Sequence, residues 1–145
     1  MDNDPRGLRG HTGPPRKLLV VDDNVLLAGA TALFAQSIGF DVLTLNSSDR
    51  AIETFLSFCP DFVILDLMLP AKDGLAVLQE ILTTGSSARI ILTSGLPDIR
   101  QRLAARVPSA APPHVTVLRK PYCLDDLLAV LRGGEIGVDQ HAMVS

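Results

Sequence analysis

A single carboxylate interrupts the apolar stretch FVILDLML at residues 62–69. The residues that lead up to Asp66 have the composition of a buried strand. Taking an ionised carboxylate out of water is costly unless it is paired with a cation or bound to a metal. Asp66 therefore either has a charged partner or caps the turn that follows the strand.

Polar side chains also follow three other predicted strands. The apolar run that begins at Lys17 is followed by Asp22 and Asp23, another strand ends at Thr93, and the last one is followed by Lys120. Open parallel sheets bind their ligands outside the carboxyl ends of their strands. We expect these side chains to meet Asp66 at that edge.

These residue types suit phosphoryl transfer. Clustered carboxylates favour a hard cation such as Mg²⁺, which prefers oxygen ligands. Lys120 can balance the acids or hold an anion, and Thr93 can donate a hydrogen bond to an anionic oxygen. A carboxylate can itself be the nucleophile and form an aspartyl phosphate. Asp66 stands alone and is the predicted phosphoacceptor, whereas the adjacent Asp22 and Asp23 suit metal binding.

Each of these residues also has an ordinary interpretation. Asp22 and Asp23 could cap the following helix, which is compatible with metal binding. Thr93 could be a β-branched residue ending a strand, and Lys120 could be a surface lysine. The phosphoryl-transfer hypothesis depends on the residues occurring together.

The elements that must position these residues are five strand–helix pairs. Gly39 and Pro60 are typical residues for ending the first two helices. Strands that alternate with helices predict an α/β fold with a parallel sheet covered on both faces. The predicted strands are 17–21, 40–45, 61–66, 89–93 and 114–118, and the helices are 25–38, 47/49–58, 74–84, 97–106 and 123–132.

Composition limits the other functions. The chain has 145 residues, enough for one domain, and its net charge of −3 gives no general attraction to nucleic acid. Two cysteines with no Cys/His spacing exclude a disulfide framework or zinc site. No secretory signal or membrane span is evident, so we expect a soluble cytoplasmic protein. We expect a flexible arm at 1–16, a domain at 17–132 and a tail at 133–145.

Four motifs together resemble the response-regulator receiver domain of two-component signalling. They are LLVVDDN (18–24), ILDLMLPAKDG (64–74), IILTSG (90–95) and LRKP (118–121). Their order and spacing match the family from about residue 16 to 132. The resemblance implies a flavodoxin-like (βα)5 doubly wound sandwich whose five parallel strands lie in the order 2-1-3-4-5.

The resemblance also implies a Mg²⁺-dependent reaction. Asp66 would accept a phosphoryl group from a partner histidine kinase or phosphotransfer protein. Asp23 would bind Mg²⁺ directly, Asp22 mostly through water, and Met68 through its backbone carbonyl.

Further positions of the family pattern hold the phosphoryl group or transmit its presence. Thr93 and Lys120 would hold the phosphoryl oxygens, and the bond before Pro121 is a candidate cis peptide. Many receivers have an aromatic switch residue three positions before this lysine, but here that position is Val117. We therefore expect phosphorylation to be preserved and its readout to be altered.

The expected partners are proteins. About a dozen residues follow the last predicted helix, too few for a DNA-binding domain. The chain would signal to a downstream protein, relay the phosphoryl group or be a fragment of a longer regulator. The face formed by the fourth helix, fifth strand and fifth helix is a candidate homodimer surface.

Two other functions compete with this one. A Mg²⁺-dependent phosphohydrolase with an Asp nucleophile often needs a second acid two positions later, where this chain has Met68. An unphosphorylated pseudo-receiver would act only as an interaction domain, but such domains tend to lack acidic or lysine positions that are all present here. A flavin-binding function is weaker still, because no phosphate-cradling loop or stacking aromatics are evident.

Overall fold

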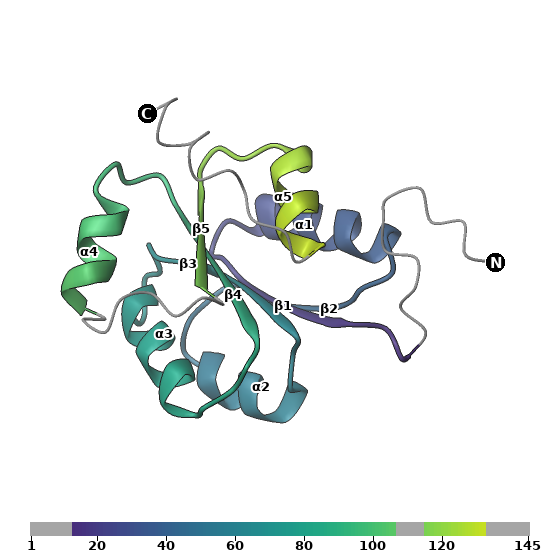
Figure 1. Cartoon of the computed structure of the whole chain (residues 1–145), viewed down its shortest axis with the longest axis horizontal. Helices are drawn as coiled ribbons and strands as arrows, with labels where there is room; N and C mark the ends of the chain where they lie inside the picture. Colours follow the sequence, from purple (N-terminus) through teal and green to yellow (C-terminus); the bar gives the residue numbers. More distant parts are fainter. Residues whose placement is uncertain (1–12, 107–114, 133–145) are drawn as a thin grey trace.

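The fold is a five-stranded parallel sheet between two layers of helices (Figure 1). The computed structural model describes residues 13–106 and 115–132. The strands are β1 (Lys17–Val21), β2 (Asp41–Leu45), β3 (Phe62–Asp66), β4 (Arg89–Ser94) and β5 (Val115–Arg119). The helices are α1 (Val25–Ser37), α2 (Ala51–Phe58), α3 (Gly74–Thr83), α4 (Ile99–Arg106) and α5 (Leu124–Leu131).

The strand order is β2-β1-β3-β4-β5, which confirms the predicted topology. All four strand pairs are parallel. β3 is central and pairs with β1 on one side and β4 on the other. Asp66, the last residue of β3, lies opposite Thr93 of β4. The strand ends that carry the predicted functional residues therefore lie at one edge of the sheet.

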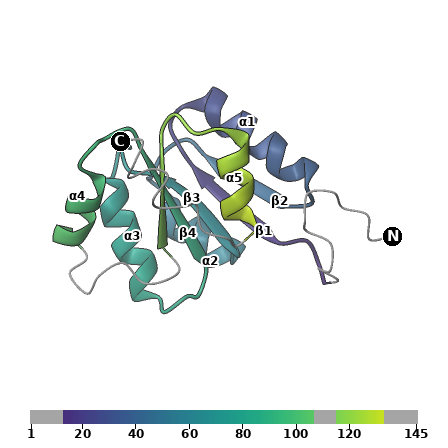
Figure 2. The same cartoon turned by 45° about the horizontal axis from the view of Figure 1, so that its top comes forward.

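Alternate residues of each central strand pack against opposite helix layers, as strand geometry requires. In β1, Leu19 and Val21 face the core shared with α2, α3 and α4. Leu18 and Val20 face the core shared with α1 and α5. Figures 1 and 2 show these two helix layers on opposite sides of the sheet. Because both faces are covered, the interior strands are nearly continuous apolar runs.

Helix α1 presents an unexpected face to the sheet. The side chain of Asn24 caps it by accepting a hydrogen bond from the Leu27 amide. Leucines recur in it at helical spacing, but Leu26 and Leu33 are exposed. The residues that the helix buries are small: Ala28, Thr31, Ala32 and Ala35. This face lets α1 lie close to the sheet.

Several predicted boundaries shift by a few residues. Helix α2 begins at Ala51, after the serines expected to start it, and α4 begins at Ile99. Strand β5 extends to Arg119. Helical spacing in the sequence places Leu124 on the same inward side of the last helix as Leu127 and Leu131, but Leu124 is exposed in the structure. The expected features at 1–12, 107–114 and 133–145 lie outside the described residues.

The helices in the described part of the chain are all too short or too polar to cross a membrane.

Candidate functional site

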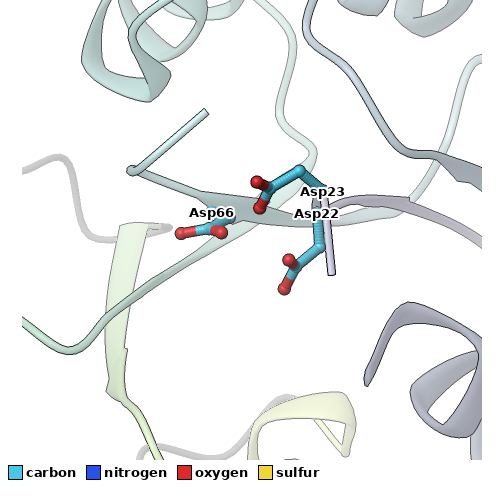
Figure 3. A group of neighbouring side chains, drawn as sticks. All are labelled: Asp22, Asp23 and Asp66. Carbon is cyan, nitrogen blue, oxygen red and sulfur yellow. The ribbon is translucent and has the colours of Figure 1, made fainter. Parts of the chain in front are cut away.

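Three carboxylates meet where two neighbouring strands end. Asp66 closes β3, and Asp22 and Asp23 directly follow β1, its neighbour in the sheet. One oxygen from each carboxylate lies within 4.8 Å of the others. Figure 3 shows the Asp23 carboxylate directed toward Asp66, while that of Asp22 points another way. Asp22 and Asp66 are buried and Asp23 is exposed, so the cluster is open to solvent on one side.

Short hydrogen-bonded turns fix the two buried acids. The amide of Asn24 donates to Asp22 Oδ1 at 2.9 Å, and the amide of Met68 donates to Asp66 Oδ1 at 3.0 Å. The side-chain amide of Asn46, beyond β2, donates to the Asp22 carbonyl at 3.0 Å. Each carboxylate thus receives a backbone donor from the residue two positions ahead, which sets its orientation.

Lys120 is the cation that these acids require. Its ammonium lies 3.1 Å from Asp22 Oδ2 and 3.1 Å from Asp66 Oδ2. Its amide donates to the Ser94 carbonyl at 2.8 Å, which fixes the chain as it leaves β5. The Lys120–Pro121 peptide bond is cis, the isomer named for this position on the basis of the sequence. The ion pair between Lys120 and Asp66 is therefore the charged partner that the burial of Asp66 led us to expect.

Burial and charge act against each other at these groups. Burial raises the pKa of the Asp66 carboxyl, although the Met68 amide and Lys120 oppose that effect. Burial disfavours the charged form of Lys120, but its hydrogen bonds and charge pairing with Asp22 and Asp66 leave the pKa of its ammonium raised. Lys120 is therefore firmly protonated at neutral pH.

Thr93 supplies a hydroxyl without a partner. Its side chain is fully buried, and among the described residues its Oγ1 has no hydrogen-bond partner. Leaving a buried hydroxyl unsatisfied costs about 1–3 kcal/mol. Its backbone carbonyl accepts from the Leu67 amide at 3.0 Å, which ties the threonine to the chain just beyond Asp66. An anionic oxygen bound at Asp66 is the kind of acceptor this hydroxyl lacks.

The donor set fits a magnesium ion. Three carboxylates within 4.8 Å offer hard oxygen ligands, and Lys120 is the cation paired with two of them. The open side at Asp23 leaves room for water, which Mg²⁺ retains in its coordination shell. Met68, the other predicted ligand, follows Asp66 by two residues and contributes its amide to that carboxylate.

Two further positions complete the surroundings of the site. Val117 is buried in the core beneath α2, α3 and α4, opposite Leu92 in the sheet. Tyr122 hydrogen-bonds through its hydroxyl to Thr31 Oγ1 of α1 at 3.0 Å. Neither Tyr122 nor Thr31 was assigned a role from the sequence, because a contact across 91 residues has no local signature. A polar threonine on the apolar helix α1 is the signal that could have pointed to it.

The geometry defines an α/β protein with an acidic, lysine-balanced site at the carboxyl edge of its sheet. The model of the family described as "Response regulator receiver domain" matches residues 18–132. The chain belongs to this family of signalling domains, for which phosphorylation and Mg²⁺ binding are characteristic.

Relatives and solved structures agree with the family. The chain is 30% identical over 121 residues to the transcriptional regulatory protein TrcR of Mycobacterium tuberculosis, covering 83% of this chain and 46% of that protein. It thus spans about half the length of the curated relatives it matches.

Two similar solved structures contain a beryllofluoride group. One is the CheX–CheY–BeF3–Mg²⁺ complex of Borrelia burgdorferi, with a TM-score of 0.74, 25% identity and coverage of 90% of this chain and 96% of that one. The other is the BeF3-activated receiver domain of RstA from Klebsiella pneumoniae, with a TM-score of 0.68, 27% identity and coverage of 81% and 96%.

Proposed function

We propose that this receiver domain accepts a phosphoryl group on Asp66 from the phosphohistidine of a partner histidine kinase or phosphotransfer protein. The observation that carries the proposal is the Lys120 ammonium, 3.1 Å from both Asp22 and Asp66. Thr93, opposite Asp66 in the sheet, adds a buried hydroxyl that has no partner among the described residues. The Lys120 cation and the Thr93 hydroxyl are suited to stabilise the negative charge that a phosphoryl group would bring to Asp66.

The transfer forms one bond and breaks one. An oxygen of ionised Asp66 attacks phosphorus while the bond from phosphorus to the partner's imidazole nitrogen breaks, and the imidazole is released. Met68 holds the other oxygen, Oδ1, through its amide at 3.0 Å. Oδ2, which faces Lys120 at 3.1 Å, is then the oxygen placed to react. Lys120 and Thr93 would hold the oxygens of the arriving group.

The acids nearest Asp66 would hold the metal. Asp23 would be a direct ligand, Asp22 would act mostly through water, and the Met68 carbonyl and Asp66 would complete the protein ligands. A Mg²⁺ ion held by these residues would neutralise negative charge on the transferring group. Two buried carboxylates sharing one lysine support this assignment, because a second cation is needed before an anion can approach them.

Signalling would follow through protein contacts. The surface formed by α4, β5 and α5 is the proposed site for a downstream protein or a homodimer. It carries exposed basic residues on α4, including Arg100, and an exposed acid, Asp125, at the start of α5. Opposite charges on one surface can pair across a twofold axis.

The test is intact mass after incubation with acetyl phosphate and Mg²⁺. We expect one phosphoryl adduct that is lost in Asp66→Asn and without metal. An adduct that persists in Asp66→Asn would place the phosphoacceptor elsewhere. Repeated turnover of a small phosphate ester would favour a phosphohydrolase. A protein that neither binds Mg²⁺ nor becomes labelled by acetyl phosphate or a phosphohistidine donor would be a pseudo-receiver.

A further inference from the structure

The two halves of the site sit on strands that do not touch. Asp22 and Asp23 follow β1, whereas Lys120 follows β5, and both β3 and β4 lie between those strands. No sheet hydrogen bond joins β1 directly to β5, so the sheet relates the lysine to the Asp22–Asp23 pair only through β3 and β4. Side-chain contacts can link these two parts of the site directly.

One such contact is made by two residues of the site, and the other joins α1 to the segment after Lys120. The first is Lys120 Nζ to Asp22 Oδ2 at 3.1 Å. The second is the hydrogen bond between Tyr122 Oη and Thr31 Oγ1 at 3.0 Å. Thr31 belongs to α1, whose first turn is joined to Asp22 through the Asn24 amide. Tyr122 is two residues beyond Lys120. The Tyr122–Thr31 hydrogen bond thus links the segment that follows Lys120 to the helix that follows Asp22 and Asp23.

The surroundings make this pair a firm contact. Thr31 is 2% exposed, and the ring of Tyr122 packs against the apolar core shared by α1 and α5. Burial raises the pKa of the Tyr122 phenol, so it remains a neutral hydroxyl across the physiological range. Either hydroxyl can donate, and the bond gives the buried Thr31 hydroxyl a partner.

The two contacts respond differently to phosphorylation. A phosphoryl group on Asp66 and a metal near Asp22 would compete for both carboxylates that now hold the lysine. The Lys120–Asp22 contact must then weaken. The Tyr122–Thr31 hydrogen bond involves no reacting group, so it remains to hold the segment after β5.

We propose that Tyr122 is a positioning residue for phosphoryl transfer. Its hydrogen bond to Thr31 fixes the β5–α5 connection on α1 and thereby keeps the Lys120 ammonium at Asp66 when the contact with Asp22 is given up. This inference rests on the proposed function. The positioning of Lys120 would depend on the Tyr122 hydroxyl and not on the packing of its ring.

The test removes single hydroxyls without changing shape. Tyr122→Phe and Thr31→Val each delete one partner, and Thr31→Ser keeps a hydroxyl as the matched control. With acetyl phosphate and saturating Mg²⁺, we expect the first two variants to label Asp66 about threefold to tenfold more slowly. Thr31→Ser should stay near the unmodified protein. The double variant should be no slower than the slower single variant, because both remove the same bond.

A second readout does not require phosphorylation. The sequence has three lysines, Lys17, Lys72 and Lys120, so reductive methylation can be followed at each by peptide mass spectrometry. In Tyr122→Phe we expect Lys120 to react about threefold faster, with Lys17 and Lys72 unchanged as internal controls. A uniform increase at all three lysines would indicate general loosening and would contradict a positioning role.

The outcomes separate the two proposals. If the unmodified protein is never labelled, the proposed function fails, and the lysine reactivity alone decides whether Tyr122 positions Lys120. If folded Tyr122→Phe matches the unmodified protein in both labelling rate and Lys120 reactivity, the positioning role is wrong. A lower melting temperature with both readouts unchanged would leave Tyr122 a purely structural residue and would likewise overturn the inference.

Discussion

Asp66 is the residue at which the demands of folding and function oppose each other. Its carboxylate is buried beside Asp22, and both are balanced by one lysine. Burial raises the pKa of the Asp66 carboxyl despite the Met68 amide and the Lys120 charge. The folded protein therefore holds the Asp66 proton more tightly than the unfolded chain does, so ionising Asp66 reduces the stability of the fold.

The first prediction concerns Asp66 and pH. A folded-state pKa above the unfolded value gives stability that is complete below the unfolded pKa, near 4 as an approximate value, and that is lost as pH rises through the folded pKa. Asp66→Asn should therefore unfold at higher temperature than the unmodified protein at neutral pH. The gain should be about 1.4 kcal/mol for each pKa unit that the site adds, and it should vanish toward acid pH.

Thermal unfolding from pH 3 to pH 8, approximate limits set by the carboxyl titration range, measures this difference. Asp41→Asn is the control, because Asp41 is an exposed acid on the edge strand β2. An Asp66→Asn advantage that grows toward acid pH would reverse the expected sign and show that the native site favours the ionised carboxylate.

The second prediction concerns the unpartnered hydroxyl of Thr93. Thr93→Val keeps the shape of the side chain and removes the unsatisfied oxygen. We expect the protein without ligands to gain about 1 kcal/mol in free energy of unfolding. The same variant should lose part of the stabilisation that beryllofluoride and Mg²⁺ confer, because a donor to the bound group is missing.

Urea unfolding with and without these ligands measures both effects. Thr93→Ser retains the hydroxyl and should keep the stabilisation by ligand. Full stabilisation of Thr93→Val by beryllofluoride would remove Thr93 from the set of groups that hold the phosphoryl oxygens.

At the scale of elements, helix α3 is held unusually close to the chain beyond Asp66. Gly74 begins this helix, and a Cβ placed there would clash with the Asp66 carbonyl oxygen and lie 2.6 Å from Leu67 Cα. The Gly74 amide donates to the Leu67 carbonyl at 3.3 Å. The glycine thus allows the backbone contact that closes the loop around Asp66, the proposed phosphoacceptor.

The third prediction compares two helical glycines. Gly74→Ala should lower the free energy of unfolding by about 2–3 kcal/mol, because backbone must move to admit the methyl group. It should also slow phosphorylation of Asp66 by displacing its carbonyl. Gly29→Ala is the matched control: a Cβ at this exposed position of α1 meets nothing within 4 Å, so alanine should add about 0.5–1 kcal/mol. Equal effects of the two substitutions on stability would contradict the close approach at Gly74.

The sequence predicted the strands well and the helix faces less well. The buried strands are apolar runs ended by polar residues, so their positions and order followed from local pattern and the family motifs. Helix α1 is apolar on nearly every side, so periodicity could not select its buried face. The structure buries Ala28, Thr31 and Ala35 and leaves Leu26 and Leu33 exposed, because small residues permit a closer approach to the sheet.

In the site, too, residues at strand ends were predictable from the sequence and helix contacts were not. Asp22, Asp23, Asp66 and Lys120 could be grouped from sequence because parallel strands bring their carboxyl ends together. The Tyr122–Thr31 contact could not, because it depends on which side of α1 meets the segment after β5. Residues fixed by strand ends are therefore predictable here, whereas contacts that depend on helix rotation are not.

At the scale of the whole molecule, hydrogen bonds tie the site to helix α1, whereas the contacts of helix α4 with its surroundings are weaker. Asn24 joins it to α1, and Tyr122 joins the segment beyond Lys120 to the same helix. Helix α4 buries Ile99 and Leu103. Its last residue, Arg106, contacts α3 through an exposed ion pair with Asp73 and accepts a hydrogen bond from the Gln79 side chain at 2.7 Å. Exposed ion pairs contribute about 0–1 kcal/mol. A groove of about 220 Å³ also separates parts of α4 from the loop that follows β3.

Val117 affects how a conformational change caused by phosphorylation would be transmitted to α4. It lies on β5 in the core shared with α4. At this position many receivers have an aromatic residue that changes between a buried and an exposed rotamer. Valine has a single short side-chain torsion with one preferred rotamer, so it cannot make that movement. If Thr93 senses the phosphoryl group as proposed, no large side chain at position 117 is present to carry the change toward α4.

The last prediction follows from this contrast. In amide spectra recorded with and without beryllofluoride and Mg²⁺, we expect the largest shifts at Asp23, Met68 and Thr93 and in the segment from Lys120 to Tyr122. Shifts at Ile99–Arg106 of α4 and Val115–Val117 of β5 should be small. Asp66→Asn is the control for changes caused by Mg²⁺ alone. Shifts in α4 as large as those beside Asp66 would show that the signal reaches this helix without an aromatic at position 117. The readout would then have to pass through the backbone of β4 and the loop that follows it.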